Sequence, residues 1–287
     1  MIAFYALPHT RLPDSKADVL DNAARLDDES WKLRLWGVFY AFDASPLAAK
    51  AEAYVLGLDE SDASGRASRD RDLTTVGARM YRSPRSGRFD FEVEGAWQSG
   101  LARGSTNPTD VTDLDVEAHF VHLEAGRKFA APWSPRLVAV FDKVSGDKNP
   151  ADREANRFDT LYGPRRSDFG PTGIYGPLGR SNMLSPGVRL ELAPNKAWDG
   201  QVFYRALWLD EVRDAFSNTG VKDASGAAGD FAGHQLEVRA RRWLVDKRVR
   251  MDIGGAYLAR GGFLKRAPNA TDGGDTLYGY IDVTSTF

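Results

Sequence analysis

Residues 88–98 read Arg-Phe-Asp-Phe-Glu-Val-Glu-Gly-Ala-Trp-Gln, so apolar and charged side chains alternate along this stretch. In a β-strand, successive side chains point to opposite faces of the sheet. The alternation therefore predicts a strand with one apolar face and one charged face. The apolar face would carry Phe89, Phe91, Val93, Gly95 and Trp97.

The same period of two recurs along the chain. It is clear in residues 188–192, 235–241 and 248–257. Weaker alternation marks residues 2–7, 31–42, 48–58, 71–82, 114–128, 135–143, 198–209 and 277–287. Together these ranges predict about twelve strands, and only residues 17–26 favour a short helix. We therefore predict an all-β fold of antiparallel strands joined in chain order.

The composition narrows the classes of partner and chemistry. The chain has 287 residues, of which 42% are hydrophobic and 27% charged, with a net charge of −2 and no cysteine. A net charge near zero does not favour binding to polyanionic nucleic acid, so we expect no nucleic-acid partner. Without cysteine the chain has no disulfides, thiolate metal sites or cysteine nucleophiles. No apolar run approaches the roughly 18 residues of a membrane helix, which excludes a helical membrane protein.

The connections between the predicted strands alternate in length. Long ones at 8–30, 59–70, 99–113, 144–183, 210–231 and 260–276 alternate with short ones at 43–47, 83–86, 129–134, 194–197 and 244–247. Short turns at one end and long loops at the other are typical of an outer-membrane β-barrel. The strands have the roughly 9–11 residues that cross a bilayer when tilted. Aromatic residues such as Trp31, Trp97 and Trp208 lie near strand ends, as interfacial girdles do. We predict an antiparallel up-and-down transmembrane β-barrel in the bacterial outer membrane.

Several segments resemble one known family. Residues 73–79 contain a Gly-x-Arg element and residues 89–100 a Glu-x-x-x-Gln-x-Gly element, and further patterns lie at 158–163, 208–216, 233–238 and 254–262. Together with a last strand that ends on Phe287, these segments make residues 70–287 similar to the alginate export family of outer-membrane porins.

The resemblance also bears on domain organisation. It implies a barrel of about eighteen strands, of which about twelve are present here. The first residues lack the basic and apolar regions of a secretory signal. We therefore interpret residues 1–287 as a single β-barrel domain whose N-terminal strands and signal peptide are missing. A complete barrel of about twelve strands is the alternative.

The charged faces of the predicted strands indicate the lumen. A charge that faces lipid costs roughly 2–4 kcal/mol at the midplane, so charged side chains should face a water-filled channel. A planar guanidinium suits carboxylates, so arginines along a pore would offer an anion successive weak sites. The alternative is that these charges pair with one another and rigidify the wall. The candidate lumen residues are Arg34, Arg79, Arg88, Arg189, Arg205, Arg239, Arg241, Arg250, Glu92, Glu94 and Glu237.

We therefore predict a passive channel and not an enzyme. It would pass anionic saccharides, such as the alginate that the resemblance implies, or other organic anions, without a cofactor or a metal. Its partners would be outer-membrane lipid, the solute and a periplasmic export protein. A soluble all-β carbohydrate-binding module and an outer-membrane barrel hydrolase are the alternative functions. His119 and His122 should lie on opposite faces of one strand, so they cannot chelate one metal.

The connection at 144–183 has two possible places. Its Gly and Pro content, with Arg165 and Arg166, suits a loop that folds into the pore as a constriction. A surface cap is the alternative.

Overall fold

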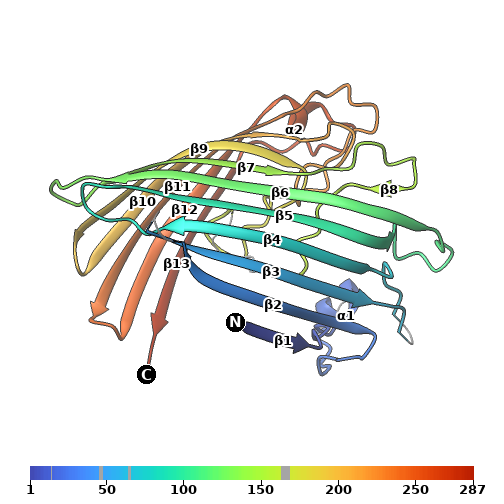
Figure 1. Cartoon of the computed structure of the whole chain (residues 1–287). Helices are drawn as coiled ribbons and strands as arrows, with labels where there is room; N and C mark the ends of the chain where they lie inside the picture. The colour runs from blue at the N-terminus through green and yellow to red at the C-terminus, as the bar shows by residue number, and fades with distance from the viewer. Residues whose placement is uncertain (14, 45–47, 64–65, 163–168) are drawn as a thin grey trace.

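The computed structural model describes residues 1–13, 15–44, 48–63, 66–162 and 169–287, and Arg165 and Arg166 lie outside these residues. The described residues form one curved sheet (Figure 1). Its strands are β1 (Ile2–Ala6), β2 (Leu33–Ala44), β3 (Ala49–Glu60), β4 (Asp72–Arg82), β5 (Phe89–Arg103), β6 (Asp113–Lys128), β7 (Arg136–Val144), β8 (Glu154–Ala155), β9 (Met183–Asn195), β10 (Trp198–Trp208), β11 (Phe231–Val245), β12 (Val249–Arg260) and β13 (Thr276–Ser285).

The strands pair in chain order from β1 to β13, and β8 alone lies off this path, in a parallel pair with β6. Every pair along the path is antiparallel. The prediction of an all-β, antiparallel, up-and-down fold is therefore confirmed. Among the described residues β1 and β13 do not pair with each other, so the sheet keeps two edges.

The connections confirm the predicted alternation of length. At one end of the sheet the strands are joined by the short connections 83–88, 129–135, 196–197 and 246–248. At the other end lie the long connections 104–112, 145–182, 209–230 and 261–275. Short turns and long loops therefore occupy opposite ends of the sheet, as in outer-membrane barrels.

The two faces of the sheet differ as the alternation in residues 88–98 predicts. On β5 the side chains of Asp90, Ala96 and Gln98 are buried, whereas Val93 and Trp97 are exposed on the opposite face. The exposed face carries large apolar groups across most of the sheet, including Val76, Val188, Val202, Leu236, Val238, Ile253 and Ile281. An apolar surface of this extent on a single layer needs an apolar environment, and hydrocarbon supplies one.

The long loops cover part of the inner face. Their residues Phe169, Leu178, Phe216 and Phe263 form one buried cluster with strand residues such as Leu207. The apolar core therefore lies inside the curve of the sheet, at the end with the long loops.

Helices contribute little. α1 (Lys16–Leu20) overlaps the predicted helical range 17–26 only at residues 17–20, and the Ser15 side chain caps it by accepting a hydrogen bond from the Asp18 N–H. α2 (Gly262–Arg266) was not predicted from the sequence; its Phe263 and Leu264 are buried against the strands. In the described part of the chain neither helix is long and apolar enough to cross a membrane.

The orientation of the sheet can be tested at Val238, in the middle of β11, whose side chain is 49% exposed on the outer face. Val238→Arg would place a charge in hydrocarbon and should lower the free energy of unfolding in lipid bilayers by about 2–4 kcal/mol. Val238→Leu keeps the site apolar and should change it little. A Val238→Arg protein as stable as the parent would contradict a lipid-facing outer surface.

Candidate functional site

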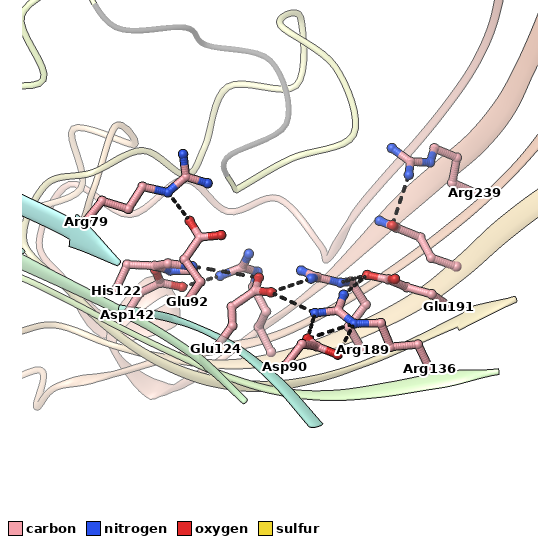
Figure 2. A network of polar contacts seen from close by, with 12 residues as sticks. Arg79, Asp90, Glu92, His122, Glu124, Arg136, Asp142, Arg189, Glu191 and Arg239 are labelled. Atoms are coloured by element: carbon pink, nitrogen blue, oxygen red, sulfur yellow. Dashed lines mark hydrogen bonds and ion pairs between the residues drawn. The ribbon is translucent and has the colours of Figure 1, made fainter. Parts of the chain in front are cut away.

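The inner face of the sheet carries a network of ion pairs below the loops (Figure 2). Its centre is formed by Arg136 on β7 and Arg189 on β9. Arg136 Nη1 donates to Glu191 Oε1 at 2.8 Å, and Arg189 Nε donates to the same oxygen at 2.8 Å. Arg189 Nη2 also donates to Glu124 Oε2 at 2.8 Å, and Arg136 binds the buried Asp90. These charged side chains pair with one another, which is the pairing that the second reading of the charged faces predicts.

A second cluster lies beside the first. Asp142 accepts a hydrogen bond from Arg205 Nη1 at 2.9 Å, and its other oxygen lies 2.6 Å from His122 Nδ1. Arg205 is 4% exposed, and its guanidinium lies 4.1 Å from the ring centroid of Phe203 and 4.9 Å from that of Phe169. Arg205 therefore connects the wall to the loop that contains Phe169.

Nearer the N-terminal edge, Arg79 on β4 donates from Nε to Glu92 Oε1 at 2.8 Å, and its Nη1 lies 3.7 Å from Glu52. Tyr54 donates from its hydroxyl to Glu94 Oε1 at 2.9 Å. These side chains are half-buried, so water or a solute can reach them.

Strands β11 and β12 carry arginines that have fewer carboxylate partners than Arg136 and Arg189. Arg241 pairs with Asp199 at 2.7 Å. Arg239 donates to the neutral amide oxygen of Gln201 at 3.0 Å, and Arg250 lies over the Trp243 ring at 5.7 Å. Within the described residues neither Arg239 nor Arg250 forms an ion pair. Their guanidinium charges are therefore not neutralised by a direct ion pair within these residues.

Nine of the eleven predicted lumen residues lie on the inner face of a strand; Arg34 and Arg88 do not. The prediction for Arg34 is wrong, because this residue shares the outer face with Trp36 and pairs with Asp59 opposite it on β3. Arg34 lies at the start of β2, at the end of the sheet with the long loops, where Asp59 neutralises its charge. Arg88 lies exposed in the short connection before β5. The nine are Arg79, Glu92, Glu94, Arg189, Arg205, Glu237, Arg239, Arg241 and Arg250.

Several members of the network were not among the predicted lumen residues: Asp142, His122, Glu124 and Arg136. His122 does lie on the face opposite His119, as predicted, because it pairs with Glu94 and His119 pairs with the outward Trp97. Among the described residues no group of acidic or histidine side chains is arranged to hold a metal ion.

Residues 156–162 and 169–182 of the connection between β7 and β9 fold into the curve of the sheet, as the first alternative for 144–183 predicts. Phe158, Phe169, Tyr175 and Leu178 are all buried there. Thr172 Oγ1 lies 2.6 Å from the Tyr278 hydroxyl of β13. We call residues 156–162 and 169–182 the inner loop.

Two glutamines on opposite parts of the wall hold the inner loop. Gln98 on β5 donates to the Asp159 carbonyl at 3.1 Å and accepts from the Asp159 N–H at 2.9 Å. Gln235 on β11 donates to the Phe169 carbonyl at 3.0 Å and accepts from the Tyr175 hydroxyl at 2.7 Å. Both glutamines are 0% exposed. A buried amide left without its partners is costly, so the glutamines favour the folded-in position of the loop.

Two loop carboxylates lie close together outside the sheet: the half-buried Asp147, between β7 and β9, and the buried Asp214, between β10 and β11. Burial and the neighbouring Asp214 carboxylate raise the pKa of Asp147. Asp214 itself accepts a hydrogen bond from Arg157 Nη1 at 2.8 Å.

The inner loop leaves two cavities against the wall. The larger, of about 720 Å³, lies toward β1–β6. The smaller, of about 550 Å³, lies over the ion-pair network and is lined by Arg79, Arg189, Arg205, Arg239, Glu92 and Glu237 among others.

A single antiparallel meander with an apolar outer face, a charged inner face and a loop folded inside defines a porin-type outer-membrane β-barrel protein. The family model described as alginate export matches residues 17–274, so the chain belongs to the alginate export family. The match begins well before residue 70, where the resemblance seen in the sequence starts. This is a transport family of the bacterial outer membrane and not a family of enzymes. A search of the curated proteins finds no match to the chain.

The role of the glutamines can be tested by single-channel conductance. Gln98→Leu and Gln235→Leu keep the side-chain size but remove the hydrogen bonds to the inner loop. Each should release the loop and raise the conductance, and each lost buried bond should destabilise the folded-in position by about 1–3 kcal/mol.

Gln201→Leu is the matched control, because Gln201 faces the same lumen but binds Arg239 and not the loop. It should leave the conductance near that of the parent. Equal conductance in all three variants and the parent would show that the glutamines do not hold a constriction.

Proposed function

We propose that this chain forms the wall of an outer-membrane channel through which anionic saccharides or other organic anions diffuse. The observation that carries the proposal is the smaller cavity, where arginines from β4, β9, β10 and β11 converge beneath the inner loop. Family membership supports a porin-type role in alginate export in general. The Arg- and Glu-lined lumen and the choice of solute are our inference from the side chains.

The chemistry of these side chains suits transient binding. A guanidinium offers several N–H donors in one plane, which match the two oxygens of a carboxylate. In a wet lumen an exposed charge pair contributes about 0–1 kcal/mol, so each arginine binds the solute weakly and the solute can leave. Carboxylates such as Glu92 and Glu191 hold the arginines in place, because they accept their hydrogen bonds.

The anion preference should depend most on arginines without an acidic partner. Arg239 lies on β11 beside the smaller cavity, and its partner Gln201 carries no charge. In contrast, Arg136 and Arg189 face Glu124 and Glu191, which cancel much of their field. Arg239 is therefore the residue that we expect to set selectivity.

We also propose that further strands close the sheet between β1 and β13 in the assembled barrel. Unpaired peptide groups cannot remain exposed to hydrocarbon, so both edges need partner strands. If cysteines at neighbouring positions of β1 and β13 form a disulfide, the two strands close the barrel directly and the alternative of about twelve strands holds.

Selectivity can be measured as the reversal potential across a bilayer with a KCl gradient. Arg239→Gln should lower the anion-to-cation permeability ratio by up to about fivefold, because an exposed charge contributes about 0–1 kcal/mol.

Arg242→Gln is the matched control: it removes the same charge three positions further along β11, from a side chain that is exposed on the outer face over Trp198. It should leave the ratio unchanged. A cation-selective parent, or equal effects of the two substitutions, would contradict an arginine-based anion pathway.

A further inference from the structure

The larger cavity differs chemically from the ion-lined one. It lies between the inner faces of β1–β6 and the inner loop, and its volume is about 720 Å³. A volume of this size is typical of small-molecule sites, which occupy about 300–1,000 Å³. Its wall is largely aromatic and aliphatic, which an ion pathway alone does not require.

Three aromatic rings form the floor of this cavity. The Phe4 and Phe39 rings are stacked with their centroids 6.3 Å apart, and Phe39 lies 5.5 Å from Tyr54. Leu35 and Leu56 extend the same surface.

Two glycines let these rings lie flat on the sheet. A Cβ on Gly37 would stand 2.5 Å from the Phe4 ring, and one on Gly77 would stand 2.2 Å from the Tyr54 ring. The rings therefore cover the backbone of the neighbouring strand, and their faces point into the cavity. We call Phe4, Phe39 and Tyr54 the aromatic floor.

The opposite side of the cavity is apolar as well. The inner loop contributes Phe158, Tyr175 and Leu178, all of which are buried. A ring-shaped group between the floor and the loop would contact apolar atoms on both sides. Burial of this kind favours a ligand with an apolar body.

One edge of the cavity is ionic. Arg79 and Arg180 line both cavities, so they stand where the two meet. Arg79 donates a hydrogen bond from Nε to Glu92, and its Nη1 lies 3.7 Å from the Glu52 carboxylate. The N–H donors of Nη2 can therefore bind a carboxylate that enters from either side.

We propose that the larger cavity is a binding site for organic acids with an apolar ring. The ring lies on the aromatic floor and the carboxylate binds Arg79 at the edge of the smaller cavity. This inference rests on the proposed channel function and names a solute class for it that is less hydrophilic than a uronate.

Current block in single channels tests the proposal, with 2-naphthoate as the ring-bearing probe and glucuronate as the hydrophilic one. The parent protein should be blocked by naphthoate at concentrations about tenfold or more below those of glucuronate, because only naphthoate buries apolar surface. Phe39→Ala should remove most of this difference by weakening the naphthoate block, and its KCl current shows that the channel still forms.

Phe42→Ala is the matched control, since Phe42 lies on the same strand but is exposed on the outer face. It should keep the preference for naphthoate. Arg79→Gln should weaken the block by both anions, and its KCl current reports that the channel still folds.

The outcomes separate this inference from the proposed function. If an anion-selective parent binds naphthoate and glucuronate equally, or Phe39→Ala keeps the preference, the ring site is wrong and the channel proposal stands. If the parent is not anion-selective and neither probe blocks it, both proposals fail.

Discussion

A peptide group inside hydrocarbon finds no water, so each N–H and C=O needs a partner on the neighbouring strand. The long, continuous ladders meet this need; β5 and β6 pair without interruption from Phe89↔Arg127 to Arg103↔Asp113. Once the ladder is fixed, the alternation of side chains leaves one face for lipid and one for water. The apolar outer surface, the ion pairs inside and the sorting of short turns from long loops all depend on this constraint.

The inner face is divided between two kinds of chemistry. Toward β7–β11 it is ionic, and most guanidinium groups pair with carboxylates, as Arg136 and Arg189 pair with Glu191. Toward β1–β3 it is aromatic and aliphatic. The inner loop separates the two regions and is held by Gln98 and Gln235, so the shape of the passage depends on neutral amides while its charge depends on arginines.

The strands and their order could be predicted because β5 and β11 alternate cleanly and the connections alternate in length. The site was predicted less well. On β2, apolar residues occupy both faces, Leu35 inside and Trp36 outside, so parity placed Arg34 wrongly. The inner side chains of β6 change from apolar at Phe120 to ionic at His122, since the loops cover one end of the lumen.

That change of chemistry depends on how a loop that is distant in sequence packs against the strand. The alternation of residues along a strand does not predict this packing. The glutamine contacts were hidden for the same reason. Gln98 and Gln235 occupy polar positions of their strands, but their partners Asp159 and Phe169 lie in a connection without periodicity. Tertiary contacts alone show that these amides bind the loop.

The contact between Thr172 and Tyr278 joins residues 106 positions apart, and it links the inner loop to β13, the last strand that the chain supplies. The loop thus takes its docking surfaces from β5, β11 and β13. Its folded-in position therefore requires strands from both halves of the sheet, and damage to one distant strand would be felt in the loop as well.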